Sequence, residues 1–186
     1  MKFLAFLSIV TAALFLLLLM VTYLFYLLVF CTGKRTPEYL ESYHIPNGKI
    51  YEPFRESMIN WIKEARAMPH EDVSIQSFDG LTLRGRYYEY APGAPIELMM
   101  HGYRGDAERD LCGGVQRCFA VGRSALIVNQ RGCGNSDGQL ITFGIHERRD
   151  CHSWLNFMLE RFGAGHGLSY PVNPKLYLKE LEDFFS

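Results

Sequence analysis

The sequence predicts an α/β fold in which a hairpin and parallel strands are flanked by helices, with one transmembrane helix ahead of them. Three observations predict this arrangement. An uncharged apolar run opens the chain. Apolar and polar residues then alternate on both sides of a turn at Asp79 and Gly80, which is typical of a hairpin. Two short apolar runs further along are each followed by a helical pattern, which indicates a parallel sheet.

The opening segment has the length and composition of a membrane anchor. The run from Phe3 to Cys31 holds no charged residue and exceeds the ~20 residues that cross a bilayer. A cleaved signal peptide has a shorter apolar region of about 7–15 residues and ends in small residues, whereas this run ends in Phe30 and Cys31. We therefore expect residues 3–31 to hold the chain in a lipid bilayer, as a single N-terminal anchor. Basic residues on the two sides nearly balance, so the side of the globular part stays open.

Three units are expected along the chain: an anchor over 1–31, a linker and amphipathic helix over 32–69, and a domain over 70–186. Glycine and proline among charges indicate the linker. Apolar residues at helical spacing then predict a helix from Glu52 to Ala67, ended by Pro69. This helix either packs on the domain or lies on the lipid surface, and its weakly basic polar face favours packing.

The third unit supplies the elements of the sheet. Val73 to Tyr87 form the hairpin, and Pro95 to Met100 and Ala125 to Val128 form two buried strands. The helices expected here run over Ala107–Val121 with Gly122 as the stop, Gly144–Phe162, and Pro174–Phe185.

Charge and cysteine content limit the function classes. The net charge is −1 with acidic and basic residues interspersed, so no nucleic-acid partner is expected. The five cysteines are odd in number and show no repeated C-x-x-C spacing, which favours free thiols over disulfides or zinc. His, Cys and Asp do occur close together between Glu147 and His152, but on a helix they point in different directions. No metal and no cofactor are therefore expected.

A first candidate site follows the strand that ends at Met100. His101-Gly102-Tyr103-Arg104-Gly105 lets the backbone turn sharply and point N–H groups into a cleft. An oxyanion hole needs such donors, placed where negative charge develops. Gly102 and Tyr103 are the candidate donors, and an ordinary strand-to-helix turn is the alternative.

Two further motifs supply a candidate nucleophile and base. Gly134 to Gly138 matches G-x-S-x-G and offers Ser136, although no strand leads directly into Gly134 and no helix follows at once, as a nucleophile elbow requires. His166 lies in a glycine-flanked loop near the C-terminus, and imidazole suits a general base because its pKa is near neutrality.

These three motifs, in this order, resemble the α/β-hydrolase superfamily, in particular its membrane-anchored bacterial esterase or peptidase-like members. The resemblance implies an oxyanion donor at Tyr103, a base at His166, and hydrolysis of a small ester or peptide-like substrate through a serine acyl-enzyme. It also implies that Ser136 belongs to the family's earlier Arg-Gly-x-Gly-x-Ser-x-Gly loop, in which the serine is structural.

The sequence departs from this family after Phe162, where the nucleophile elbow and the acid segment are expected. The chain passes directly to the loop of His166, as after an internal deletion. Because the elbow strand normally pairs with the strand that ends at His101, we expect that strand to be an open edge. Three interpretations follow: a serine hydrolase if complete but inactive as written, a non-catalytic membrane-anchored binding module, or an active protein that uses Ser136 with His166.

Overall fold

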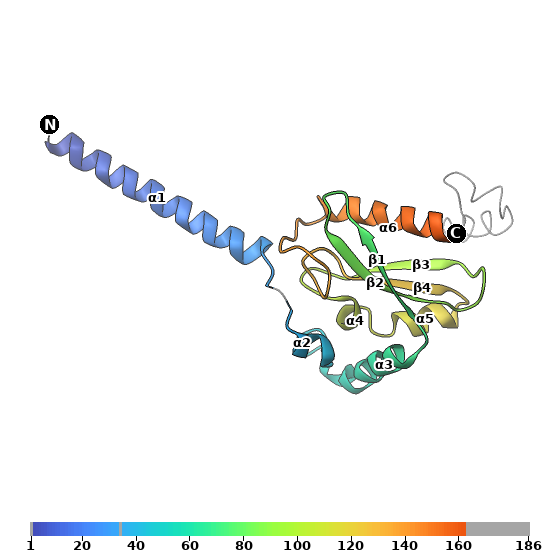
Figure 1. The fold of residues 1–186 in the computed structure, drawn as a ribbon. Coiled ribbons are helices and arrows are strands. Elements are labelled where there is room, and N and C mark those ends of the chain that lie inside the picture. Colours follow the sequence, from blue (N-terminus) through green and yellow to red (C-terminus); the bar gives the residue numbers. More distant parts are fainter. Residues whose placement is uncertain (1, 34, 163–186) are drawn as a thin grey trace, which may run out of the picture.

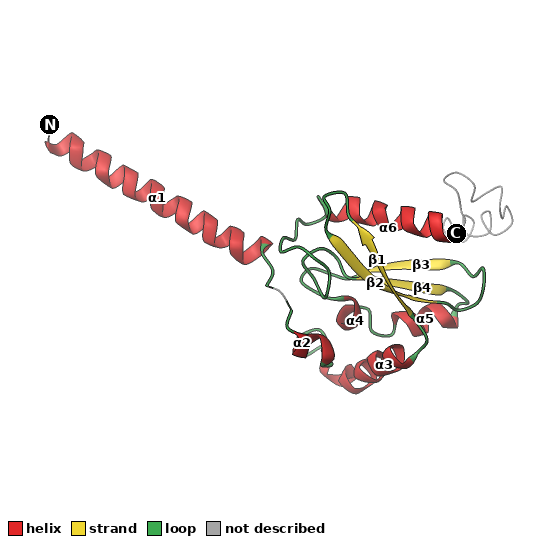
Figure 2. Cartoon of the chain, viewed as in Figure 1, coloured by secondary structure: helices red, strands yellow, loops and turns green. Residues whose placement is uncertain are grey.

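In the computed structural model, which describes residues 2–33 and 35–162, a four-stranded sheet lies between two layers of helices (Figures 1 and 2). A long helix, α1 (Lys2–Phe30), projects away from these layers. Its most apolar window has a mean hydropathy of 2.8, and none of that window is buried against the rest of the protein. Helix α1 is thus long and apolar enough to cross a bilayer.

The sheet confirms the predicted hairpin and parallel pair. Its strands are β1 (Glu71–Gln76), β2 (Thr82–Tyr88), β3 (Ile96–Met100) and β4 (Ser124–Val128), in the order β1-β2-β4-β3. Strands β1 and β2 are antiparallel, β2 and β4 are antiparallel, and β3 runs parallel to β4. Within the described residues β3 pairs with β4 alone, so the strand that ends before His101 lies at an edge of the sheet, as expected.

Helices cover both faces of the sheet. Helix α6 lies on one face, and α3, α4 and α5 lie on the other (Figure 1). Their bounds, with those of two short elements ahead of them, are α2 (Pro37–Glu41), η1 (Glu52–Phe54), α3 (Arg55–Ala67), α4 (Ala107–Asp110), α5 (Gly114–Ala120) and α6 (Glu147–Phe162).

Strand β4 divides the hydrophobic core into two clusters. All five of its residues are buried, and successive side chains point to opposite faces. Leu126 and Val128 pack with Trp154 of α6, whereas Ala125 and Ile127 pack on the side of α5. A central strand buried on both faces explains why its sequence is a continuous apolar run.

The helix predicted over Ala107–Val121 is two helices, a correction to the sequence analysis. Gly113 has a φ of +82°, which ends the helical path between α4 and α5. A Cβ at Gly113 would lie 3.0 Å from the indole of Trp61 on α3. The close approach of Trp61 explains why a glycine breaks the helix here, and it places α3 against the domain. Packing, rather than a position on lipid, is therefore observed for α3.

Helix α6 begins later than predicted because a carboxylate folds back over its start. The side chain of Glu147 accepts hydrogen bonds from the N–H of Thr142 at 2.7 Å and the N–H of Gly144 at 2.8 Å. Such reciprocal capping fixes the first turn. On the inward face of α6, Trp154 is buried and Phe157 packs against the core, whereas Leu155 is exposed.

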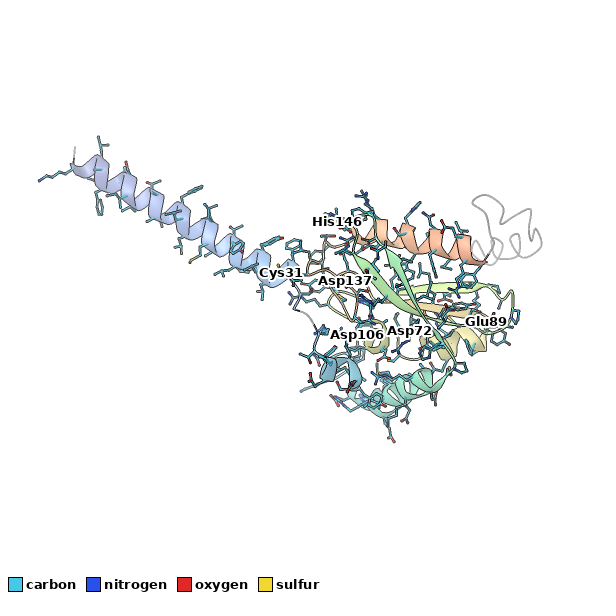
Figure 3. All side chains as sticks on the ribbon, in the orientation of Figure 1. Cys31, Asp72, Glu89, Asp106, Asp137 and His146 are labelled. Atoms are coloured by element: carbon cyan, nitrogen blue, oxygen red, sulfur yellow. The ribbon has the colours of Figure 1, made fainter. Side chains whose placement is uncertain are left out.

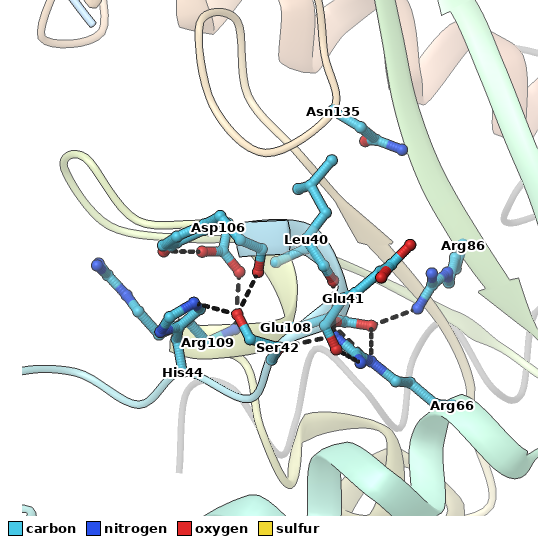
Figure 4. Close-up of polar contacts among 12 residues, drawn as sticks. Leu40, Glu41, Ser42, His44, Arg66, Arg86, Asp106, Glu108, Arg109 and Asn135 are labelled. Carbon is cyan, nitrogen blue, oxygen red and sulfur yellow. Dashed lines mark hydrogen bonds and ion pairs between the residues drawn. The ribbon is translucent and has the colours of Figure 1, made fainter. Parts of the chain in front are cut away.

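The segment expected as a linker is docked on the domain. Arg66, near the end of α3, donates hydrogen bonds to the carbonyls of Leu40, Glu41 and Ser42 at 2.7–3.1 Å (Figure 4). The same guanidinium pairs with Glu108 at 2.5 Å. These contacts cap the carbonyl end of α2 with a cation, which suits the helix dipole. His166 and the helix predicted over Pro174–Phe185 lie outside the described residues.

Candidate functional site

The turn after β3 and the loop after β4 meet at the carboxyl ends of these two parallel strands. His101 is buried and joins them: its Nε2 accepts a hydrogen bond from the N–H of Gln130 at 3.0 Å. The ring proton then lies on Nδ1, which donates to the carbonyl of Gly102 at 2.8 Å. Burial lowers the pKa of His101. This histidine is therefore a neutral connector between the two loops.

The N–H of Gly102, one of the candidate oxyanion donors, is engaged by a side chain of α4. It donates to Oδ2 of Asp110 at 3.2 Å. A carboxylate at this position occupies the donor and places negative charge beside it, where an oxyanion would have to bind. Asp110 is itself paired with the adjacent Arg109 at 2.7 Å.

The other residues of the turn bind the end of α1. The hydroxyl of Tyr103 donates to the carbonyl of Val29 at 2.5 Å, and Arg104 donates to the carbonyl of Cys31 at 2.7 Å and also to that of Leu28. The last carbonyls of a helix have no partner within the helix, and a cation there is favourable. Because α1 has no basic residue in its own last turn, Arg104 supplies the charge from the domain.

A second segment completes this attachment. The N–H of Ile141 donates to the carbonyl of Phe30 at 2.8 Å, and the N–H of Thr32 donates to the carbonyl of Gln139 at 2.8 Å. The ring of Phe143 stacks on Tyr103 and meets Phe30 edge-on. We refer to the two segments that hold α1, residues 101–105 and 139–143, as the α1 socket.

Ser136, the candidate nucleophile, holds its loop against the sheet. Its hydroxyl donates to the carbonyl of Asn129 at 2.7 Å and accepts from the N–H of Arg84, on β2, at 2.9 Å. Ser136 also borders a cavity that Arg35 and His146 help to line. Among residues 2–33 and 35–162, no histidine is hydrogen-bonded to this hydroxyl.

Another residue of this loop, Asp137, also binds β2. The N–H of Asp137 donates to the carbonyl of Thr82 at 2.9 Å, and its carboxylate accepts from Arg84 at 2.8 Å. Gly134 has a φ of +52°, and a Cβ there would overlap the side chain of Asn129. The glycines of the motif thus let the loop turn tightly beside β2.

Arg131 is the buried centre of the loop. Its guanidinium binds both carboxylate oxygens of Asp150 at 2.6 and 2.7 Å, and it pairs with Asp79 in the hairpin turn at 2.8 Å. Hydrogen bonding to Arg131 lowers the pKa of Asp79 to about 2. Loop, hairpin and α6 are therefore joined by one cation.

Two features near this site were not predicted from the sequence. One is the ion-pair group of Arg66, Arg86 and Glu108, and the other is the binding of α1 by the two segments of the α1 socket. Arg86 binds the carboxylate of Glu108 at 2.5 Å, opposite Arg66 (Figure 4). These partners lie far apart in the sequence and share no motif, so no local pattern signals them.

Other candidate chemistry is limited in the part of the chain that the structure describes. All five cysteines are free, and burial raises the pKa of Cys133 to about 11, which disfavours the thiolate. No group of three or more His, Cys, Asp or Glu side chains that could hold a metal ion occurs within the described ranges.

No family model matches the chain, and no curated protein matches it. Solved structures of similar fold include α/β hydrolases. An esterase from Pyrococcus furiosus has a TM-score of 0.48 and 21% identity, over 53% of this chain and 38% of that one. An α/β hydrolase from Vibrio vulnificus has a TM-score of 0.45 and 17% identity, over 72% and 46%. A putative α/β hydrolase from Agrobacterium tumefaciens has a TM-score of 0.43 and 24% identity, over 48% and 43%.

The likeness is one of fold, and the chain spans less than half the length of these hydrolases.

Proposed function

We propose that this chain is a membrane-anchored, hydrolase-derived module whose domain is held at the bilayer by α1 and does not hydrolyse esters or amides through Ser136. One observation carries the proposal: the turn that was expected to form an oxyanion hole binds other parts of this chain. The N–H of Gly102, one of the two candidate donors, is bound by Asp110, and the side chains of Tyr103 and Arg104 bind carbonyls of α1.

The surroundings of Ser136 support the same conclusion. A serine nucleophile needs a base that takes its proton and an oxyanion site about 3 Å from the reacting atom. The proton of Ser136 is donated to a backbone carbonyl, and a backbone N–H of β2 occupies the oxygen from the other side. This arrangement suits a residue that fixes a loop.

A fluorophosphonate probe tests the catalytic part of the proposal. The full chain in detergent micelles is incubated with the probe, and its intact mass is measured beside that of Ser136→Ala. We expect no adduct on either protein. An adduct on the wild type that disappears in Ser136→Ala would show that Ser136 is a nucleophile, and would return His166 to consideration as its base.

The same variant tests the structural role of Ser136. Removing the hydroxyl leaves the carbonyl of Asn129 and the N–H of Arg84 without this partner, which costs about 1–3 kcal/mol when such groups are buried. We expect Ser136→Ala to lower the free energy of unfolding by this amount, measured by urea titration. Ser153→Ala is the control, because the hydroxyl of Ser153 makes one exposed bond to its own helix.

A further inference from the structure

Exposed apolar side chains surround the end of α1. Tyr103, Leu140, Phe143 and Ile145 are 49%, 39%, 59% and 63% exposed. We call these four residues the collar. Isolated exposed apolar residues are ordinary on a soluble surface, but a contiguous group of them marks an interaction site. Within the collar the rings of Tyr103 and Phe143 stack with their centroids 5.0 Å apart, and Leu140 and Ile145 lie within three residues of Phe143 in the chain.

The position of the collar relative to α1 is fixed by hydrogen bonds. Leu140 forms a β-bridge with Cys31, and its neighbour Ile141 donates to the carbonyl of Phe30. Cys31 lies at the junction of α1 and the domain, whereas Glu89 lies at the far end of the domain (Figure 3). If α1 crosses a bilayer, the collar is therefore the part of the domain that lies level with its surface.

The backbone at Phe143 gives a second, independent sign. Phe143 has a φ of +50°, a conformation that bulky side chains rarely adopt. The capping bonds from Thr142 and Gly144 to Glu147 impose this turn, and the ring remains 59% exposed. Strained residues held by their surroundings cluster at functional positions. Here the strain directs an aromatic ring away from the core, beside the last turn of α1.

We propose that the collar inserts into the headgroup region of the bilayer that α1 crosses, so that its partner is a lipid surface. This inference rests on the proposed anchoring by α1. Aromatic and aliphatic side chains bind this region through their apolar area. Arg148 follows the collar in the first turn of α6 and is exposed, whereas the guanidinium of the neighbouring Arg149 lies over the ring of Phe78, 3.4 Å from its centroid. The guanidinium of Arg148 fits a lipid phosphate.

Photocrosslinking of the full chain in vesicles of phosphatidylcholine and phosphatidylglycerol tests the proposal. Phe143 or Ile145 is replaced by p-benzoylphenylalanine, and phospholipid adducts are measured by mass after irradiation. The matched control is Val121, which is 61% exposed and directly follows α5, a helix that lies away from α1 (Figure 1). Leu17, 51% exposed on α1, reports on the anchor itself.

We expect lipid adducts at positions 143, 145 and 17, each at least several-fold above position 121. If position 17 gives lipid adducts but positions 143 and 145 give no more adduct than position 121, the collar does not insert into the bilayer, although α1 is still an anchor. Crosslinks from 143 or 145 to a second copy of the chain in place of lipid would also overturn it. Without an adduct at 17, the anchoring itself fails and the collar with it.

Discussion

At the scale of single residues, Arg131 is buried at the site and binds the carboxylates of both Asp150 and Asp79. Its side chain is 4% exposed, and that of Asp150 is 1% exposed. Charges removed from water to this extent are stable only when paired. The Arg-Gly-x-Gly-x-Ser-x-Gly motif therefore has a structural explanation, in which the arginine joins three elements and the glycines and Ser136 shape the loop.

Replacing Arg131 tests this explanation. Arg131→Met leaves the carboxylate of Asp150 buried without its partner, so we expect a loss of about 3–5 kcal/mol in the free energy of unfolding. Urea titration followed by near-ultraviolet circular dichroism measures it. Arg84→Met is the control, because its ion pair with Asp137 is 37% and 47% exposed and contributes less than about 1 kcal/mol. Equal losses in the two variants would contradict the central role of Arg131.

His101 gives a prediction about pH. Burial holds its folded-state pKa below the ordinary value of 6.5, so the unfolded chain binds a proton here before the folded chain does. The contribution to stability is complete above pH 6.5 and is lost as the pH falls below it toward the folded-state pKa. We expect the free energy of unfolding to decrease between pH 7.5 and pH 5.5, and to decrease less in His101→Gln. An identical slope in both proteins would show that His101 does not contribute.

At the scale of elements, the strands and most helices could be predicted from sequence, because local patterns encode them. A few adjacent residues encode each of three features: the hairpin turn, strand β4, and the end of the helix before Pro69. The predicted helix bounds were wrong at Gly113, where a side chain distant in the sequence determines the local structure. Trp61 explains the break at Gly113 in this way. The start of α6 is set by Glu147, a capping signal close in the sequence that was not used in the prediction. The resemblance implied a structural serine at position 136, which remains a prediction, and nothing local shows that Tyr103 and Arg104 bind α1.

Gly85 in β2 is another position that the sequence analysis did not single out. A Cβ there would lie 2.7 Å from the carbonyl oxygen of Ile127 and 2.9 Å from a methyl group of Val128. We expect Gly85→Ala to separate β2 from β4 and to cost about 1–3 kcal/mol, measured by urea titration. Gly33→Ala, where no atom lies within 4 Å of the new Cβ, should change the stability by less than about 0.5 kcal/mol. A neutral Gly85→Ala would mean that the two strands are less closely packed than described.

At the scale of the whole molecule, the joint between α1 and the domain determines how the two parts are held together. The α1 socket satisfies the carbonyls of Leu28, Val29, Phe30 and Cys31, each of which accepts a hydrogen bond from the domain. If α1 crosses a bilayer, as we propose, a helix attached in this way would hold the domain in one orientation beside it. The turn after β3 takes part in two sets of contacts: its side chains Tyr103 and Arg104 bind α1, and its Gly102 N–H binds Asp110 of α4.

Hydrogen–deuterium exchange of the full chain in lipid nanodiscs tests this joint most directly. The amides of Thr32 and Ile141 are hydrogen-bonded across it. We expect both to be protected in the wild type and to exchange faster in Arg104→Met, while β4 keeps its protection. Exchange of both amides at the rate of an unfolded chain in the wild type would contradict this prediction, because α1 would then not be held by the α1 socket.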